Sequence, residues 1–224
     1  MAGVLATFLE GMTYLSENLP TFWGLLQRHL LLVLVSEAVA IAVAVPLGVL
    51  AVRYERLKEP ILSLGNVAQT VPPLAIIALM FPILGLGLVP PLVALFIYAL
   101  LPVLVNTITG LESVDESTID AAKGMGMTAT ERLRKIRLPL AVPVIFAGIR
   151  TSIVINVGTA YLAFFIGGGG LGVWVISGIN LFNMPQVVAG AVPGALLAIT
   201  LDLVLALAES RLGTTSPNTS QVVA

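Results

Sequence analysis

Long apolar segments dominate the sequence and are separated by short polar connections. A helix that crosses the hydrocarbon core of a membrane needs roughly 20 mostly apolar residues. A membrane β-strand instead alternates polar and apolar residues over about 10 positions. Five segments fit the helical pattern: about 30–52, 61–84, 88–109, 141–166 and 187–208. The pattern predicts an all-α integral membrane protein with five transmembrane helices, spanning residues 29–212.

The two ends of the chain differ from this apolar pattern. Residues 1–28 mix aromatic side chains with few charges, which is typical of an external segment lying along the membrane interface. No basic region precedes an apolar run there, so we expect no cleaved signal peptide. Residues 213–224 are short and polar, and we expect a disordered tail.

Positive charges lie almost entirely in the connections on one side of the predicted spans. Only Arg28 lies on the opposite side. Basic residues concentrate in cytoplasmic loops, so the amino terminus is expected outside and the carboxyl terminus in the cytoplasm. The basic residues of the cytoplasmic side are Arg53, Arg56, Lys58, Lys123, Arg132, Arg134, Lys135, Arg137 and Arg211.

Composition narrows the possible chemistry. Only 10% of residues are charged and 58% are hydrophobic, whereas a soluble domain carries about 25% charged residues. Eleven basic against 12 acidic residues leave no positive field for nucleic acid. The sequence has no cysteine, which excludes disulfides and thiolate sites, and His29 is its single histidine. We therefore expect no metal site, and a membrane enzyme is a weak alternative.

The connection at residues 110–140 is charged and amphipathic, unlike the rest of the chain. Ser113 with Glu116, and Thr128 with Glu131, fit the capping box that begins a helix. They predict two short helices, about 115–125 and 129–137, the first stopped by Gly124 or Gly126 and the second ending before Pro139. Such a loop is either a solvated connection or a stiff projection that docks another protein.

One motif in this loop resembles a known signature. Asp120-Ala121-Ala122, then Gly126, then Ile136-Arg137-Leu138-Pro139 resembles the cytoplasmic EAA motif of ABC importer permeases. That motif reads E-A-A, three residues, G, nine residues and I-x-L-P. Every spacing matches, and the one departure is Asp120 in place of glutamate. The five-span plan with the motif between spans three and four is also similar to that family's methionine-permease-like membrane core.

The resemblance implies a division of labour between subunits in the inner membrane of a prokaryote. In that family the loop docks on a separate ATPase subunit, which binds ATP. The chain itself has no G-x-x-x-x-G-K-[ST] phosphate loop, so we expect no cofactor here. Coupling to the ATPase would fall to Asp120, Ala121, Ala122, Gly126, Ile136, Leu138 and Pro139, with Arg132 and Arg134 as weaker candidates.

The sequence at residues 66–75 and 168–172 resembles the osmoprotectant branch of these permeases, which imports glycine betaine, carnitine and choline. The resemblance also implies a separate substrate-binding protein and a second permease copy or a paralogue. A permease for another solute, such as methionine, is the nearest alternative. An ion-coupled secondary transporter is the alternative from another class, with Glu37 and Asp202 as its proton or ion sites.

Polar residues inside the spans are candidates for a translocation path. They form one stripe on the second span and one on the fourth, and either they line the path or they join helices by hydrogen bonds. They are Asn66, Gln69 and Thr70, and Ser152, Asn156 and Thr159.

Three charged residues lie within the predicted spans. Arg150 and Asp202 each lie about 10–14 Å from the cytoplasmic ends of their spans, at 1.5 Å per residue, and could pair. A structural pair and a gate that breaks and reforms are both open at this point. Glu37 could bind a cation or face an internal water.

Overall fold

The computed structural model describes residues 2–212, and within this range every regular element is a helix. The order is α1 Ala2–Glu17, α2 Leu19–Arg53, α3 Glu55–Thr70, α4 Pro73–Leu84, α5 Val89–Glu112, α6 Glu116–Gly124, α7 Ala129–Arg132, a π-helix Leu133–Arg137, α8 Leu138–Thr159, a 3₁₀ helix Ala160–Ile166, α9 Gly172–Asn180 and α10 Met184–Leu212. The predicted all-helical class is confirmed. The predicted tail at 213–224 lies outside the described residues.

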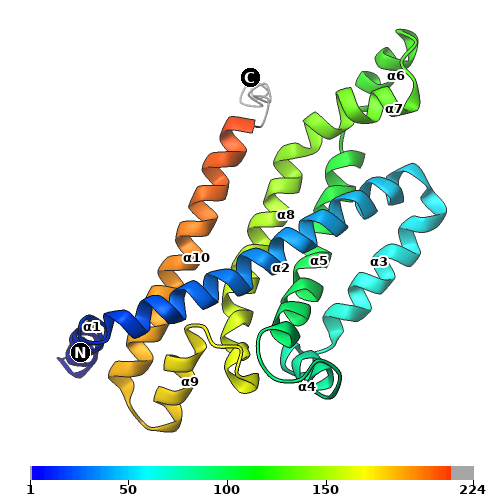
Figure 1. Ribbon diagram of the computed structural model, residues 1–224. Helices are drawn as coiled ribbons and strands as arrows, with labels where there is room; N and C mark the ends of the chain where they lie inside the picture. The colour runs from blue at the N-terminus through cyan, green and yellow to red at the C-terminus, as the bar shows by residue number, and fades with distance from the viewer. Residues whose placement is uncertain (1, 213–224) are drawn as a thin grey trace.

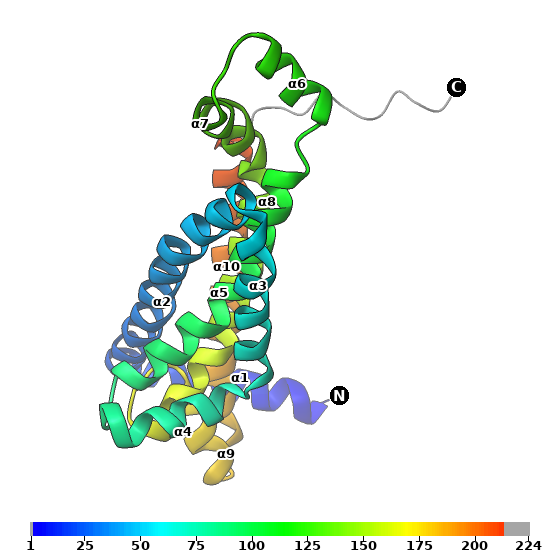
Figure 2. The same cartoon turned by 90° about the vertical axis from the view of Figure 1, so that its right-hand side faces the viewer.

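The long helices form an elongated bundle with different elements at its two ends (Figure 1). α5 packs between α2 and α8, and α10 packs on α8. α6 and α7 project from one end, whereas α4 and α9 lie at the other (Figures 1 and 2). α1 lies at the α9 end, where it packs against α10.

Within residues 2–212, four continuous helical segments are long and apolar enough to cross a membrane, or five if the bent pair α3 and α4 counts as one span. The span predicted over 61–84 is not one continuous helix, because α3 and α4 meet at 92°. Pro72 and Pro73 cause the break. Proline disfavours the helical conformation in the residue before it, and Val71 is indeed extended, with φ −80° and ψ 123°. Pro73 then begins α4, where a missing N–H costs nothing.

Other predicted boundaries also shift. The fourth span was predicted as 141–166, but its α-helix ends at Thr159 and a 3₁₀ helix continues to Ile166. α2 begins at Leu19, so the predicted segment 1–28 is divided between α1 and the first turns of α2. The segment between the last two spans contains α9 rather than an open loop.

Small buried side chains let the central helices approach closely. Ala44 and Ala51 of α2 and Ala141 of α8 have at most 1% of their surface exposed, and they pack around Leu104 and Leu111 of α5. Small residues at helix interfaces allow the close backbone contact that stabilises bundles in lipid. These contacts fix the position of the second half of α2 against α5 and the start of α8.

The start of α6 differs from the prediction. Asp115, not Ser113, caps this helix: its carboxylate accepts hydrogen bonds from the Ser117 hydroxyl at 2.6 Å and from the Ser117 amide at 3.4 Å. These bonds lower the pKa of Asp115, the hydroxyl bond most. Ser113 instead donates to the Gly110 carbonyl at the end of α5. The predicted capping box at Ser113 is wrong because α5 continues to Glu112, and the Ser113 hydroxyl bonds to a carbonyl of that helix instead.

The second predicted helix of the loop begins at the expected residue but continues into α8. The capping box of Thr128 and Glu131 is confirmed, with both reciprocal bonds present. The predicted end before Pro139 is wrong, because α7 passes through the π-helix directly into α8. Proline lacks an N–H and its ring crowds the carbonyl four residues earlier. The wider π-turn, in which the Leu138 amide donates to the Leu133 carbonyl, accommodates Pro139 without breaking the helix.

Candidate functional site

The motif of the projecting loop places an exposed and a buried face on α6. The side chains of Asp120 and Ala121 are exposed, and Asp120 forms an ion pair with Lys123 at 2.7 Å. On the other face, Ile119 and Ala122 are 5% and 1% exposed. The motif therefore combines residues that hold α6 in place with residues available to another protein.

Gly126 makes the turn between α6 and α7. Its φ is +77°, a left-handed conformation that residues with a Cβ adopt only with strain. The turn is fixed by hydrogen bonds from Met125 to the Ala121 carbonyl at 3.0 Å and from Met127 to the Ala122 carbonyl at 3.1 Å. Of the two glycines proposed to stop the first helix, Gly126 is the left-handed one.

The second half of the motif lies at the junction of the projection with the bundle. Ile136 is part of the π-helix, and Leu138 and Pro139 begin α8. Leu138 packs against the core formed by α2, α5 and α8. Of the weaker candidates, Arg132 donates to the Met127 carbonyl at 2.6 Å and stiffens the turn, and Arg134 is exposed. This half of the motif thus lies where the helix of the loop continues into the bundle.

A cavity of about 500 Å³ lies beneath the projecting loop. It is bounded by the ends of α2 and α5 and by α6, α7 and the π-helix, so the projection stands partly clear of the bundle. Its charged lining is Arg53, Glu112, Glu116, Lys123, Arg132 and Arg137.

The polar stripe predicted on the second span lies on α3. Asn66 and Thr70 are exposed in the isolated chain, whereas Gln69 donates to the Tyr98 carbonyl of α5 at 2.9 Å. Gln69 therefore joins two helices, and Asn66 and Thr70 remain on the surface of α3.

The stripe predicted on the fourth span lies on α8 and turns inward. Ser152 and Asn156 are fully buried, and both donate to the carboxylate of Glu37 on α2. Thr159 donates to the Ile155 carbonyl within α8. Within this chain, Ser152 and Asn156 therefore make the helix-to-helix hydrogen bonds of the alternative interpretation.

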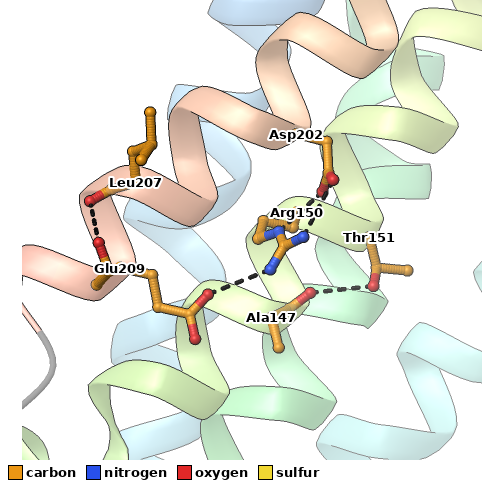
Figure 3. A network of polar contacts seen from close by, with 7 residues as sticks. Ala147, Arg150, Thr151, Asp202, Leu207 and Glu209 are labelled. Carbon is orange, nitrogen blue, oxygen red and sulfur yellow. Dashed lines mark hydrogen bonds and ion pairs between the residues drawn. The ribbon is translucent and has the colours of Figure 1, made fainter. Parts of the chain in front are cut away.

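Arg150 and Asp202 lie side by side on α8 and α10 (Figure 3). The Arg150 guanidinium donates two hydrogen bonds to the Asp202 carboxylate, at 2.8 and 3.0 Å. It also reaches Glu209 at 3.4 Å. Sequence reasoning missed Glu209 because it lies one residue past the predicted end of the span. Its spacing of seven residues from Asp202, two helical turns, could have placed it on the same face.

Two consecutive residues of α2 form hydrogen bonds with the glycine-rich segment before α9. The sequence did not predict these contacts. Arg28 donates to the Gly168 carbonyl at 3.1 Å. His29 is fully buried, and its Nδ1 accepts from the Leu171 amide at 3.3 Å. Because Nδ1 accepts, Nε2 carries the hydrogen that bonds the Val157 carbonyl at 3.1 Å. His29 is therefore neutral and joins α2, α8 and the segment before α9.

Replacing His29 by alanine is expected to loosen that segment. The Leu171 amide would lose its acceptor inside the fold, and a buried unpaired donor costs about 1–3 kcal/mol. We expect amide hydrogen exchange at residues 168–173 to accelerate at least about fivefold. The matched control is Gln27→Ala at an exposed neighbouring position. Unchanged exchange in His29→Ala would show that the histidine does not hold the segment.

Curated proteins similar to this chain are membrane permeases. The choline transport system permease protein OpuBB of Bacillus subtilis (strain 168) is 47% identical over 185 residues, which are 83% of this chain and 85% of OpuBB. The glycine betaine/carnitine/choline transport system permease protein OpuCB of the same organism is 44% identical, covering 89% and 92%. The osmoprotectant import permease protein OsmW of Salmonella typhimurium is 40% identical, covering 88% and 94%.

Solved structures share the fold at lower identity. A chain of the MetNI methionine ABC transporter in an inward-facing conformation matches with a TM-score of 0.71 and 21% identity, over 87% of this chain and 95% of that chain. A second crystal form gives a TM-score of 0.72 at 20% identity, covering 88% and 96%. This likeness confirms the predicted methionine-permease-like fold.

The family comparison covers most of the bundle and the projecting loop. Residues 40–214 match the family described as binding-protein-dependent transport system inner membrane component. Together with relatives at 40–47% identity over most of their length, this match settles the family. The chain belongs to the inner membrane components of binding-protein-dependent transport systems.

Proposed function

We propose that this chain is the permease subunit of an ABC importer for osmoprotectants such as choline, glycine betaine or carnitine. The observation that carries the solute class is the 40–47% identity to permeases named for these solutes. Methionine is the alternative, because the fold is shared with a methionine transporter. The test is uptake of radiolabelled choline, glycine betaine and methionine by cells expressing the complete transporter; uptake of methionine alone would contradict the proposal.

The conformational change that drives transport is proposed to be transmitted from the ATPase to this chain through the loop at residues 110–140. The first half of its motif lies on α6, which projects from the end of the bundle (Figure 1), and the second half lies where the projection joins the bundle. A separate ATPase subunit would bind ATP and dock on α6 and α7, and a separate binding protein would deliver the solute. The projection then lies in the cytoplasm, and the amino terminus lies outside.

The solute path is proposed to form between two permease subunits, a second copy or a paralogue. Asn66 and Thr70 are exposed on α3, and an amide in contact with lipid is costly unless it has a partner. A water-filled path or a neighbouring subunit would remove that cost. Ser152, Asn156 and Thr159 are weaker candidates for the lining, because the first two are buried within the chain and bonded to Glu37.

Ala121→Arg tests the docking of the ATPase. Ala121 is exposed on α6, and arginine is a good helix former, so the fold should survive. A long charged side chain at a docking surface should reduce both ATPase recovered with the purified permease and solute uptake, by about tenfold or more. Ser210→Arg, exposed on α10 and outside the projecting loop, is the matched control and should retain more of both. Normal recovery and uptake in Ala121→Arg would exclude this face of α6 as the docking surface.

A further inference from the structure

The carboxyl group of Glu37 lies inside the bundle, where α2, α5 and α8 meet. Glu37 is 3% exposed, and its Oε2 accepts hydrogen bonds from Ser152 Oγ at 2.9 Å and Asn156 Nδ2 at 3.0 Å. The Ser152 hydroxyl also lies 3.3 Å from the Ala99 carbonyl of α5. Oε2 of Glu37 thus joins α2 to α8, and Ser152 extends the cluster to α5.

The other oxygen of this carboxyl is left without a donor. Within residues 2–212, Glu37 Oε1 and Asn156 Oδ1 are the buried side-chain atoms that have no hydrogen-bond partner. The nearby donors already have other acceptors. The Ser36 hydroxyl donates to the Leu32 carbonyl at 2.7 Å. The Asn156 amide group donates to Glu37 Oε2 and lies 3.5 Å from the Ser36 hydroxyl oxygen. An ionised carboxylate can only accept hydrogen bonds. The cluster is therefore short of one donor.

The cluster also lacks a positive charge. None of the ion pairs found in the described part of the chain includes Glu37. His29, two turns earlier on α2, is neutral and bonded to Val157 and Leu171. Arg150 on α8 is bonded to Asp202 and Glu209 on α10. A buried, unpaired negative charge is strongly unfavourable, and a group in that position neutralises itself instead.

We propose that Glu37 is a proton-binding site, in which Oε1 carries a proton and the carboxyl is neutral while α2, α5 and α8 are packed together. A proton requires no additional space, supplies the donor that the cluster lacks and removes the uncompensated charge. A water molecule could donate to both free oxygens but would leave the charge in place. A sodium ion would neutralise the charge but needs several oxygen ligands converging on one point.

The proposal concerns the packed helices and does not depend on the solute or the ATPase. It links the packing of α2 against α8 to the binding of one proton. Any conformation that separates these helices and admits water would release that proton.

Infrared spectroscopy of the full-length chain, purified from membranes with the subunits it retains, tests the proposal. A neutral carboxylic acid has a C=O stretching band separate from those of carboxylates and amides. At neutral pH the wild type should show this band, and Glu37→Gln should lose it. Glu209→Gln, which removes a carboxylate bonded to Arg150, is the matched control and should keep the band. A band absent from the wild type, or retained in Glu37→Gln, would overturn the proposal.

Stability gives a second, independent readout. Glutamine is neutral and nearly isosteric, so Glu37→Gln should unfold at the wild-type temperature, and replacing sodium by potassium or N-methylglucamine should change neither protein. If Glu37→Gln fails to fold, the site requires a charge and the proposal fails. Sodium-specific stabilisation that Glu37→Gln abolishes would assign a sodium ion instead.

Discussion

Gly172→Ala is expected to remove nearly all folded protein from the membrane. Gly172 begins α9, and a Cβ there would lie 2.8 Å from both the Cα and the carbonyl carbon of Tyr161, with the Tyr161 carbonyl oxygen closer still. These are backbone atoms of the 3₁₀ helix, so no side-chain rotation relieves the clash. Overpacking costs about 1–3 kcal/mol where side chains can move, and we expect about 3 kcal/mol or more here. Thermal unfolding and size-exclusion chromatography of the solubilised protein measure the loss.

Gly158→Ala is the matched control for this prediction. Gly158 lies near the end of α8, and a Cβ there would meet nothing within 4 Å. Alanine is better than glycine in a helix by about 1 kcal/mol, so this variant should be at least as stable as the wild type. If Gly172→Ala unfolds at the wild-type temperature, α9 does not pack on the 3₁₀ helix as described.

Arg150→Leu is expected to cause the second largest loss, by leaving two acidic side chains on α10 without a partner. Asp202 and Glu209 both bond to the guanidinium, and an unpartnered charge within a membrane span is costly. We expect about tenfold less folded protein in the membrane, measured as the monodisperse fraction after solubilisation. The double variant Arg150→Leu, Asp202→Leu also removes the carboxylate that makes the two shorter bonds, leaves only Glu209 without its partner, and should recover much of that loss.

Three further results distinguish the possible roles of this pair. Equal losses in the single and double variants would contradict an energetic pairing of Arg150 with Asp202. Glu209→Gln alone should have a small effect, because its contact with Arg150 is longer, at 3.4 Å. A double variant that folds and is stable but no longer transports solute would favour a gate over a purely structural pair.

The sequence predicted the elements whose cause is local. Apolar length predicted the long helices α2, α5, α8 and α10, and the Thr128 and Glu131 spacing predicted the start of α7. It predicted a span over 61–84 but not the 92° bend within it, because hydropathy carries no information on the backbone geometry that two adjacent prolines impose. It also ended the second loop helix before Pro139, since it could not anticipate a π-turn that accommodates the ring.

The site was predicted only in part because packing decides the role of its polar residues. Ser152, Asn156 and Thr159 share one face of α8 by spacing, but only the structure shows that Glu37 faces the first two. The bonds of His29 to Val157 and Leu171 join residues more than 120 positions apart and leave no pattern in the sequence. Periodicity reports which residues share a face, whereas the partner across the interface depends on the fold.

The helix continues without interruption from α7 through the π-helix into α8. The rotation of the projecting loop about this helix axis is therefore fixed relative to the bundle. Each helical residue advances the chain by about 100° around its axis. A single insertion within Leu133–Arg137 would therefore turn the exposed face of α6, the proposed docking surface, to another side, even if every helix remained intact. Length variation among relatives should consequently be excluded from this junction.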